Sequence, residues 1–276
     1  MVESGAMSVR TGRCLLWAAA IVVAAASEAR ADGIMLIQAG AFWMGRDDGP
    51  LDEQPLHRVF VRDFWIERQK ATNAEFAEFL DAAGLRAPGG ERRYDEDDAD
   101  ARIRRRAGRW TDDPGYERHP AVEVSWFGAR AFCAWRGRRL PTEAEWEKAA
   151  RGEDRRPYPW GWDAPTAARA ILGRPYNATA AYDDEPRGRS PYGVEDMLGN
   201  LREWTATILR PYPYRPDDGR EPFTGTGEVV VRGASHDDPV ERLSLTRRRS
   251  YDRRGASAGH HHVGFRCATS EDLGGY

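Results

Sequence analysis

Two segments in the first quarter of the chain carry short apolar runs bounded by glycine or charged residues, as β-strands do. The first, GIMLIQAGAFWMG, begins at Gly33. The second, HRVFVRDFWI, alternates at His57, Val59 and Val61 before Phe64. Because side chains in a strand point alternately to opposite faces, this spacing predicts strands with one buried face.

The next stretch, TNAEFAEFLDAAG, has the spacing and the end signals of a helix. Thr72 and Glu75 are placed to form a capping box, and Gly84 stops the pattern. One face carries the apolar residues Phe76, Phe79 and Leu80. We therefore predict a helix that packs this face into the core.

Two further helices are predicted in the middle of the chain. Ser125 is placed to cap a helix that ends at Gly137. Thr142 and Glu145 form a second capping box, which begins a helix that ends near Gly152.

Residues 88–118 interrupt these patterns. They contain nine acidic residues and eight arginines, with very few aliphatic side chains. A segment of this composition cannot bury much surface, so we predict an exposed, charged insertion within the domain. Docking of a protein partner on this insertion is a second possibility, because long loops often carry function.

Composition places the chain among ordinary globular proteins. It has 276 residues, a hydrophobic fraction of 41% and ten tryptophans, which suits one large domain with a packed core. The formal net charge of -3 gives no reason to expect nucleic acid or an anionic membrane as a partner.

Residues 1–31 have the three parts of an export signal. Arg10 and Arg13 supply positive charge, CLLWAAAIVVAAA supplies a 13-residue apolar run, and ARA at residues 29–31 is a cleavage pattern. The run is too short for a stable bilayer span. We predict a signal peptide at 1–31, a mature domain at 32–276 without a membrane span, and a secreted or periplasmic location. A buried N-terminal helix is the alternative.

Export would place the cysteines of the mature chain in an oxidising compartment. Cys14 would leave with the signal, and the mature chain would keep Cys133 and Cys267. Two cysteines in an oxidising compartment are more often bridged than free.

Several motifs occur in one order between about Gly40 and Cys267. They are HPAVEVSWFGARAFCAWRGRRLPTEAEWEKAARG, YPWGW, SPYGVEDMLGNLREW, VVVRGAS and VGFRC. In this order they resemble the formylglycine-generating enzyme family, also called sulfatase-modifying-factor proteins. The resemblance implies an α+β fold: a single domain related to the C-type lectin fold, with little regular secondary structure. It also implies a disulfide between Cys133 and Cys267.

The resemblance further implies a structural calcium ion in DMLGNLREW. By position, its ligands are the side chains of Asp196 and Glu203 and the backbone carbonyls of Gly199 and Leu201. Oxygen ligands of this kind suit a hard cation. The alternative is a loop in which Glu203 only accepts backbone N–H bonds. Arg202 stands where the family has an aromatic residue.

The stretch RGASHDDPVERLSL, which begins at Arg232, corresponds to the family's copper site. In formylglycine-generating enzymes a motif resembling RGGS is followed by two cysteines that hold copper(I), a metal that selects soft thiolates. This stretch contains no cysteine. The sequence therefore predicts a branch of the family without the copper-binding cysteine pair, and it argues against copper-dependent sulfatase activation.

Other branches of the family have different or unknown activities. One matures the pyoverdine chromophore in the periplasm. Another, the ergothioneine-type sulfoxide synthases, uses iron held by histidines of an extra N-terminal helical domain. The six histidines of this chain contain no His-x-x-x-His pair, which argues against an iron sulfoxide synthase.

The candidate catalytic residues lie in and around this stretch. His236 and Asp237 could form an acid/base pair. Alternatively, His236, Asp237 and Asp238 could join the run His260–His262 to hold zinc, iron(II) or copper(II), and the sequence does not say which transition metal. A polar surface loop is the alternative to both. The full candidate set is Trp204, Arg232, Ser235, His236, Asp237 and Asp238.

The run TRRRSYDRR also has two interpretations. Its guanidinium groups could bind an anion such as a carboxylate. They could equally serve structural ion pairs, with Arg247 or Arg248 as the family's pairing arginine.

Two kinds of function are consistent with these features. The first is an exported enzyme that carries out an oxidative or related modification of a peptide or secondary metabolite. The alternative is a catalytically inactive, lectin-like module that binds an envelope ligand or partner. A formylglycine-generating enzyme with a relocated metal site would be a third, and the missing cysteines argue against it.

Overall fold

The computed structural model describes Met1 and residues 33–175, 177–182, 188–221, 227–252 and 259–270. Apart from Met1, the predicted signal peptide lies outside these ranges. Within them, the structure contains no helix with the length and apolar character needed to cross a bilayer.

Each predicted helix is present in the described residues, and each begins as its sequence indicates. Helix α1 (Asn73–Ala83) has the predicted capping box between Thr72 and Glu75, and it ends at Gly84. Gly84 has a φ of 77°, a left-handed conformation that glycine adopts without steric cost.

The second and third helices also follow their caps. The side chain of Ser125 accepts a hydrogen bond from Gly128 N at the start of α2 (Trp126–Trp135). Helix α2 stops two residues before the predicted end, within the usual uncertainty of helix ends. Thr142 and Glu145 form the capping box of α3 (Glu143–Arg151).

Each of the two apolar segments near the start of the chain forms two strands. These are β1 (Ile34–Ile37), β2 (Gly40–Met44), β3 (His57–Val61) and β4 (Phe64–Glu67). Strand β1 pairs antiparallel with β4, and β2 pairs antiparallel with β3. Strand β11 (Ala268–Thr269) joins β4 on its other side.

A four-stranded sheet forms the frame of the candidate site. Its order is β10-β7-β8-β9, and its strands are β7 (Arg202–Ile208), β8 (Glu228–Arg232), β9 (Arg248–Asp252) and β10 (Val263–Gly264). The pairs β7–β8 and β8–β9 are antiparallel, whereas β10 lies parallel to β7. The start of β7, the end of β8 and the start of β9 therefore lie side by side.

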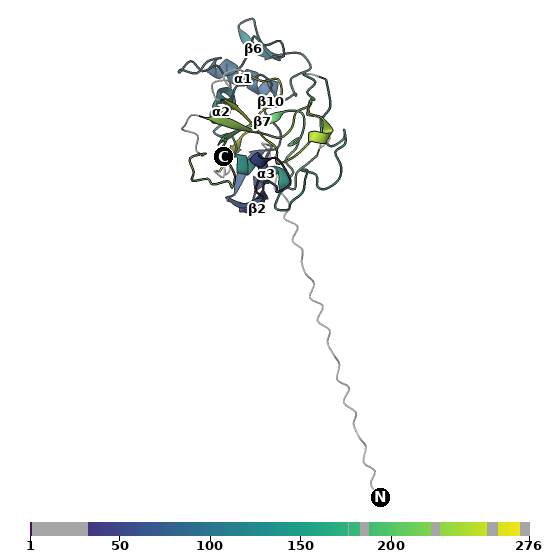
Figure 1. Ribbon diagram of the computed structural model, residues 1–276. Coiled ribbons are helices and arrows are strands. Elements are labelled where there is room, and N and C mark those ends of the chain that lie inside the picture. Colours follow the sequence, from purple (N-terminus) through teal and green to yellow (C-terminus); the bar gives the residue numbers. More distant parts are fainter. Residues whose placement is uncertain (2–32, 176, 183–187, 222–226, 253–258, 271–276) are drawn as a thin grey trace.

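The charged insertion is less exposed than its composition predicts. It forms the hairpin β5 (Ile103–Arg106) and β6 (Arg109–Asp112), which packs on α1 at one end of the molecule (Figure 1). Its few apolar side chains reach the core, and so does one arginine, Arg93, which donates to the carbonyls of Ala83 and Gly84. The buried residues are Arg93, Tyr94, Ala101, Ile103 and Trp110.

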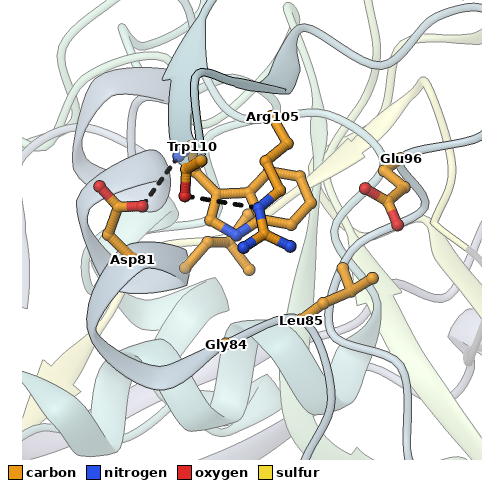
Figure 2. Close-up of a pocket in the computed structure, with 8 residues that line it drawn as sticks. Asp81, Gly84, Leu85, Glu96, Arg105 and Trp110 are labelled. Carbon is orange, nitrogen blue, oxygen red and sulfur yellow. Dashed lines mark hydrogen bonds between the residues drawn. The ribbon is translucent and has the colours of Figure 1, made fainter.

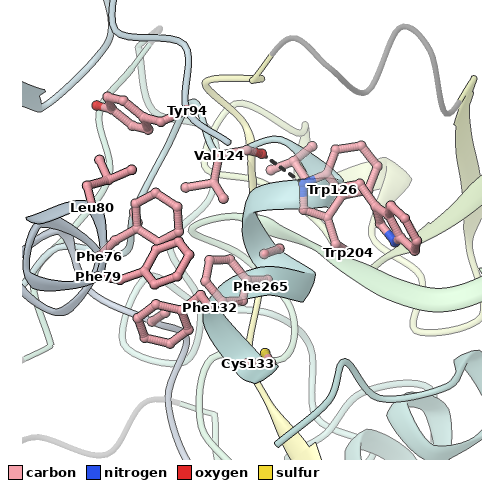
Figure 3. Packing of buried hydrophobic residues seen from close by; sticks show 14 of the residues in the cluster. Phe76, Phe79, Leu80, Tyr94, Val124, Trp126, Phe132, Cys133, Trp204 and Phe265 are labelled. Atoms are coloured by element: carbon pink, nitrogen blue, oxygen red, sulfur yellow. Dashed lines mark hydrogen bonds between the residues drawn. The ribbon is translucent and has the colours of Figure 1, made fainter. Parts of the chain in front are cut away.

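Two hydrophobic clusters form the core. The first joins α1, α2 and the four-stranded sheet around packed aromatic rings (Figure 3). Phe76 stacks on Phe132, and Phe265 meets both rings edge-on. The second lies around α3 and strands β1–β4. The Cys133–Cys267 disulfide is present and ties α2 to the segment before β11. In the part of the chain that the structure describes, three short α-helices and several small sheets joined by long loops confirm the predicted α+β class.

Candidate functional site

The stretch after β8 forms a tight turn held by its own side chains. Gly233 has a φ of 84°, and a Cβ at this position would lie 2.9 Å from the carbonyl oxygen of Met197. Ser235 N donates to Asp238 Oδ2 at 3.0 Å, and Asp238 N donates to Ser235 O at 3.1 Å. The turn therefore presents residues 235–238 in one defined arrangement.

Within this turn, His236 is fully buried. Its backbone N–H donates to Asn200 O at 2.8 Å, and its Nδ1 lies 2.9 Å from the same oxygen. Because a carbonyl can only accept, Nδ1 carries the proton and Nε2 is the ring's acceptor. Nε2 is buried and has no hydrogen-bond partner among the described residues. In this arrangement His236 is bonded to the backbone and not to Asp237.

Asp238 lies among three arginines. Arg202 donates to Asp238 Oδ2 through Nη2 at 2.8 Å and Nε at 3.2 Å. Nη2 of Arg249 lies 3.1 Å from Asp238 Oδ1, and Nη1 of Arg247 lies 3.7 Å from it. Burial opposes ionisation, but Arg202 and the Ser235 N–H outweigh it and lower the pKa of Asp238. Asp238 is thus an ionised structural anchor.

Asp237 is the carboxylate of this turn that reaches solvent. Its side chain is 35% exposed, accepts a hydrogen bond from the Ser235 hydroxyl and lies 3.9 Å from Arg202 Nη2. Burial opposes ionisation here too, but the Ser235 hydroxyl and the Arg202 charge lower the pKa of Asp237. Asp237 can therefore meet a ligand as a carboxylate.

The histidine run folds back onto strand β9. Tyr251 Oη lies 2.6 Å from His262 Nε2, and His262 Nδ1 lies 3.2 Å from His261 Nε2. His260 stacks on the Tyr251 ring at 4.3 Å between centroids. Burial, assisted by Arg202, lowers the pKa of His262 to about 3, so its ring is neutral. These contacts form a chain of groups that can each pass a proton, which we call the Tyr251–His262–His261 relay.

Two predicted site residues belong to the protein interior. Trp204 is fully buried and donates from Nε1 to Val124 O at 3.0 Å. Arg232 is also fully buried, pairs with Glu143 at 3.0 Å and with Glu147, and lies over the Trp146 ring. Both side chains are therefore positioned for packing and ion pairing in the interior, whereas the sequence placed them among the candidate catalytic residues.

Arg248 also has a structural role, as one interpretation of the arginine run predicted. It makes a two-point contact with Glu143, with Nε–Oε1 and Nη2–Oε2 distances of 2.7 and 3.0 Å.

The residues predicted to bind calcium hold two basic side chains. The ammonium of Lys70 lies 3.1 Å from Asp196 Oδ2 and 3.6 Å from Glu203 Oε1, and it also donates to the Asp196 carbonyl. Arg266 makes a two-point contact with Glu203 at 2.7 and 2.9 Å. Both basic side chains therefore supply positive charge to these carboxylates. Asp196 Oδ1 is nevertheless buried without a hydrogen-bond partner among the described residues, and burial, opposed by Lys70, raises the pKa of Asp196. The calcium ion stays a prediction.

The predicted transition-metal set is not assembled. Asp238 is held by arginines, and His236 by Asn200. In the described ranges, the one group of three side chains with converging ligand atoms is Asp100, Glu123 and His261. Sequence reasoning identified the histidine run but missed both of these acids, since 138 residues separate Glu123 from His261.

A surface pocket lies at the edge of the contact between α1 and the hairpin of the insertion. It has a volume of about 250 Å³ and lies beside Leu85, Trp110 and Arg105 (Figure 2). Asp81 closes one side by accepting from Trp110 N at 2.8 Å and from Arg109 Nε at 3.1 Å. The pocket contains none of the residues of the turn or the relay.

The comparison with known proteins assigns the family. The Sulfatase-modifying factor enzyme 1-like domain (FGE-sulfatase) matches residues 20–271. The chain belongs to this family.

Named relatives agree with this assignment. The chain is 33% identical to the formylglycine-generating enzyme of Streptomyces coelicolor, over 87% of this chain and 90% of the relative. It is 38% identical to hercynine oxygenase of Mycobacterium tuberculosis, over 67% of this chain and 48% of the relative. It is also 32% identical to the serine/threonine-protein kinase pkn1 of Chlamydia pneumoniae, over 85% of this chain. The chain thus spans about half the length of the hercynine oxygenase and 37% of the kinase.

Among solved structures, PvdO from Pseudomonas aeruginosa is similar with a TM-score of 0.65 and 28% sequence identity. The match covers 86% of this chain and 93% of PvdO. The predicted family and fold class are both confirmed.

Proposed function

We propose that this protein is an exported enzyme of the sulfatase-modifying-factor family that oxidatively modifies a small molecule or peptide. One observation carries the proposal: the partly exposed Asp237 carboxylate lies close enough to His262, a member of the Tyr251–His262–His261 relay, to interact with it electrostatically. The turn that carries Asp237 has no cysteine. The relative named hercynine oxygenase supports an oxidation as the reaction class.

The residues of the site can supply binding and proton transfer. Arg249 and Arg247 keep 32% and 26% of their side-chain surface exposed, so their guanidinium groups can hold a carboxylate of the substrate. Asp237 is ionised and can accept a proton, while Tyr251 and His262 can relay one. We propose molecular oxygen as the oxidant, as the name of the relative hercynine oxygenase suggests.

Copper chemistry at a cysteine pair is not part of the proposed reaction. We expect no formylglycine when a cysteine-containing sulfatase peptide is incubated with the purified protein, copper and oxygen. Conversion of that peptide would show that the family's best-known reaction survives here with another metal site.

The activity itself is best tested in the native host. A deletion strain is complemented with wild type, Asp237→Asn, Tyr251→Phe or the control Glu117→Gln, which changes an exposed acid outside the site. Mass spectrometry of the periplasm and medium should show a compound that differs by two hydrogens or one oxygen. Wild type and Glu117→Gln should restore the modified form, and the two site variants should not. If no compound changes in any strain, the proposal of an enzyme fails and a binding module is favoured.

Export rests on residues 1–31 and is tested separately. Fractionation of cells that carry the tagged full-length chain should place it in the periplasm or medium, with a new N-terminus near residue 32. A version without residues 1–31 should remain in the cytoplasm. Retention of the intact full-length chain in the cytoplasm would contradict the proposal.

A further inference from the structure

Glu123 is a buried carboxylate that lacks a protein partner. The residue is only 2% exposed. In the described ranges its carboxylate makes no hydrogen bond and no ion pair, although its backbone does. Burying an unpaired carboxylate is costly, so such a group is normally paired or bound to a metal. The backbone φ angle of Glu123 is 56°, a positive value that is uncommon for a residue other than glycine.

The carboxylate of Glu123 points at two other ligand groups. One oxygen of Glu123, one oxygen of Asp100 and one ring nitrogen of His261 all lie within 4.8 Å of one another. Asp100 and His261 come from the charged insertion and the histidine run, so three distant segments meet here. Their side chains are 13% and 20% exposed, which leaves an opening toward solvent.

The backbone around Glu123 is built to keep these segments together. Glu123 O accepts from Asp95 N at 2.9 Å, and Glu123 N donates to His260 O at 3.4 Å. Gly259 makes the close approach possible, because a Cβ there would lie 2.1 Å from the Glu123 carbonyl oxygen. Backbone hydrogen bonds and close packing therefore hold the segments of the cluster together.

The neighbours of the cluster can orient its ligands. Asn177 Nδ2 donates to Asp100 Oδ1 at 2.8 Å, and Asp100 Oδ2 lies 3.9 Å from His261 Nδ1. The opposite ring nitrogen of His261 faces His262 Nδ1 at 3.2 Å. In one of the two proton arrangements of the relay, His261 Nε2–H donates to His262. His261 Nδ1, 3.9 Å from Asp100 Oδ2, then carries the lone pair. Metal-binding histidines commonly donate a hydrogen bond from the opposite ring nitrogen in this way.

We propose that Asp100, Glu123 and His261 bind one divalent transition-metal ion of the zinc, manganese(II) or iron(II) class. One imidazole and two carboxylates suit these ions, and three protein ligands leave a coordination position open. The charged insertion thereby supplies a ligand to a site that includes the end of the relay. The inference does not depend on the proposed activity, because its readout is metal bound per chain.

The competing description is a cluster that holds protons instead of a metal. Burial and the charges of Asp98, Asp95 and Asp100 raise the pKa of Glu123 to about 8. A protonated Glu123 would need no cation. The two descriptions predict opposite results in a metal titration.

The test uses the purified full chain, stripped of metal with a chelator. Zn²⁺, Mn²⁺ and, without oxygen, Fe²⁺ are titrated by calorimetry, and the ions retained after gel filtration are counted by mass spectrometry. Wild type should bind one ion of at least one of these metals. Glu123→Gln and His261→Ala should each weaken this binding by at least about tenfold. The matched control Glu117→Gln should bind as wild type does.

Cobalt(II) gives a second readout that does not require full stability of every variant. Its visible absorption should change between wild type and His261→Ala, because an imidazole nitrogen leaves the coordination shell. The proposal is overturned if stripped wild type binds none of these ions at tenfold molar excess, or if both site variants bind as tightly as wild type. If Glu123→Gln does not fold, the comparison of wild type with His261→Ala decides the matter.

Discussion

Arg202 Nη2 lies 2.8 Å from Asp238 Oδ2, and this contact joins the first residue of β7 to the turn after β8. Both side chains are about 95% buried. The family resemblance implies an aromatic residue where this chain has Arg202, and thiolates in the stretch that contains Asp238. The two departures from the family pattern are thus one structural unit.

This pair should show strong energetic coupling. Asp238→Asn would leave three guanidinium groups without their shared anion and should destabilise the protein by about 3 kcal/mol. Arg202→Ala should cost less, because Arg249 and Arg247 still face Asp238. The double variant should be more stable than the sum of the single effects predicts. Urea unfolding of the four proteins measures the coupling, and strict additivity would contradict it.

Lys70 should compete with calcium at the Asp196 loop. Adding millimolar Ca²⁺ should raise the Tm of wild type less than that of Lys70→Ala, since the Lys70 ammonium lies between the two carboxylates. Lys70→Ala should lower the Tm in calcium-free buffer, because Asp196 then loses its partner. Calcium should restore part of that loss. Thermal unfolding with and without Ca²⁺ checks both statements, and an equal rise in the Tm of both proteins would contradict the competition.

Trp110 should anchor the charged insertion to the core. Its side chain is 9% exposed and packs in the first hydrophobic cluster beside Tyr94. Trp110→Ala should reduce the free energy of unfolding by about 3 kcal/mol or more. Arg105→Ala, at an exposed position of the same hairpin, should change it by less than about 0.5 kcal/mol. Equal effects of the two substitutions in urea unfolding would mean that the insertion is a detached loop.

Glu221 should make the protein less stable as the pH rises toward neutrality. Burial, opposed by the Thr207 hydroxyl, raises the pKa of Glu221 to about 7. The folded protein therefore holds this proton more tightly than the unfolded chain, whose glutamate has a pKa near 4.3. The stability that it contributes is complete below about pH 4.3 and is lost as the pH rises to about 7.

Glu221→Gln isolates this effect, because it keeps the shape of the side chain without its titration. The difference in Tm between variant and wild type should be larger at pH 7.5 than at pH 5, in favour of the variant. A difference that does not change between these two pH values would contradict the assignment.

Local patterns predicted the regular elements well. The caps at Thr72, Ser125 and Thr142 each require only residues within three positions, and all three helices begin as expected. The Cys133–Cys267 disulfide also followed from the sequence, because export and family resemblance point to the same pair. The insertion was harder, since composition does not show that its few apolar residues reach the core.

The site residues could be predicted only as a region. The stretch from Arg232 is indeed a structured turn beside the four-stranded sheet, but the roles of its side chains depend on partners far away in sequence. Arg232 faces Glu143 and Glu147, and it is therefore part of the interior. Lys70 fills the predicted calcium loop, although 126 residues separate it from Asp196.

The sequence by itself determined the family, the helices and their caps, the disulfide and the absence of a cysteine from residues 232–245, because these depend on local spacing or on residue identity. Only the tertiary structure decided which charges meet. It placed Lys70 on Asp196, Arg202 on Asp238 and His261 near Glu123. The reason is physical: a buried charge is stabilised by the group a few ångströms away, and chain folding alone determines which group that is.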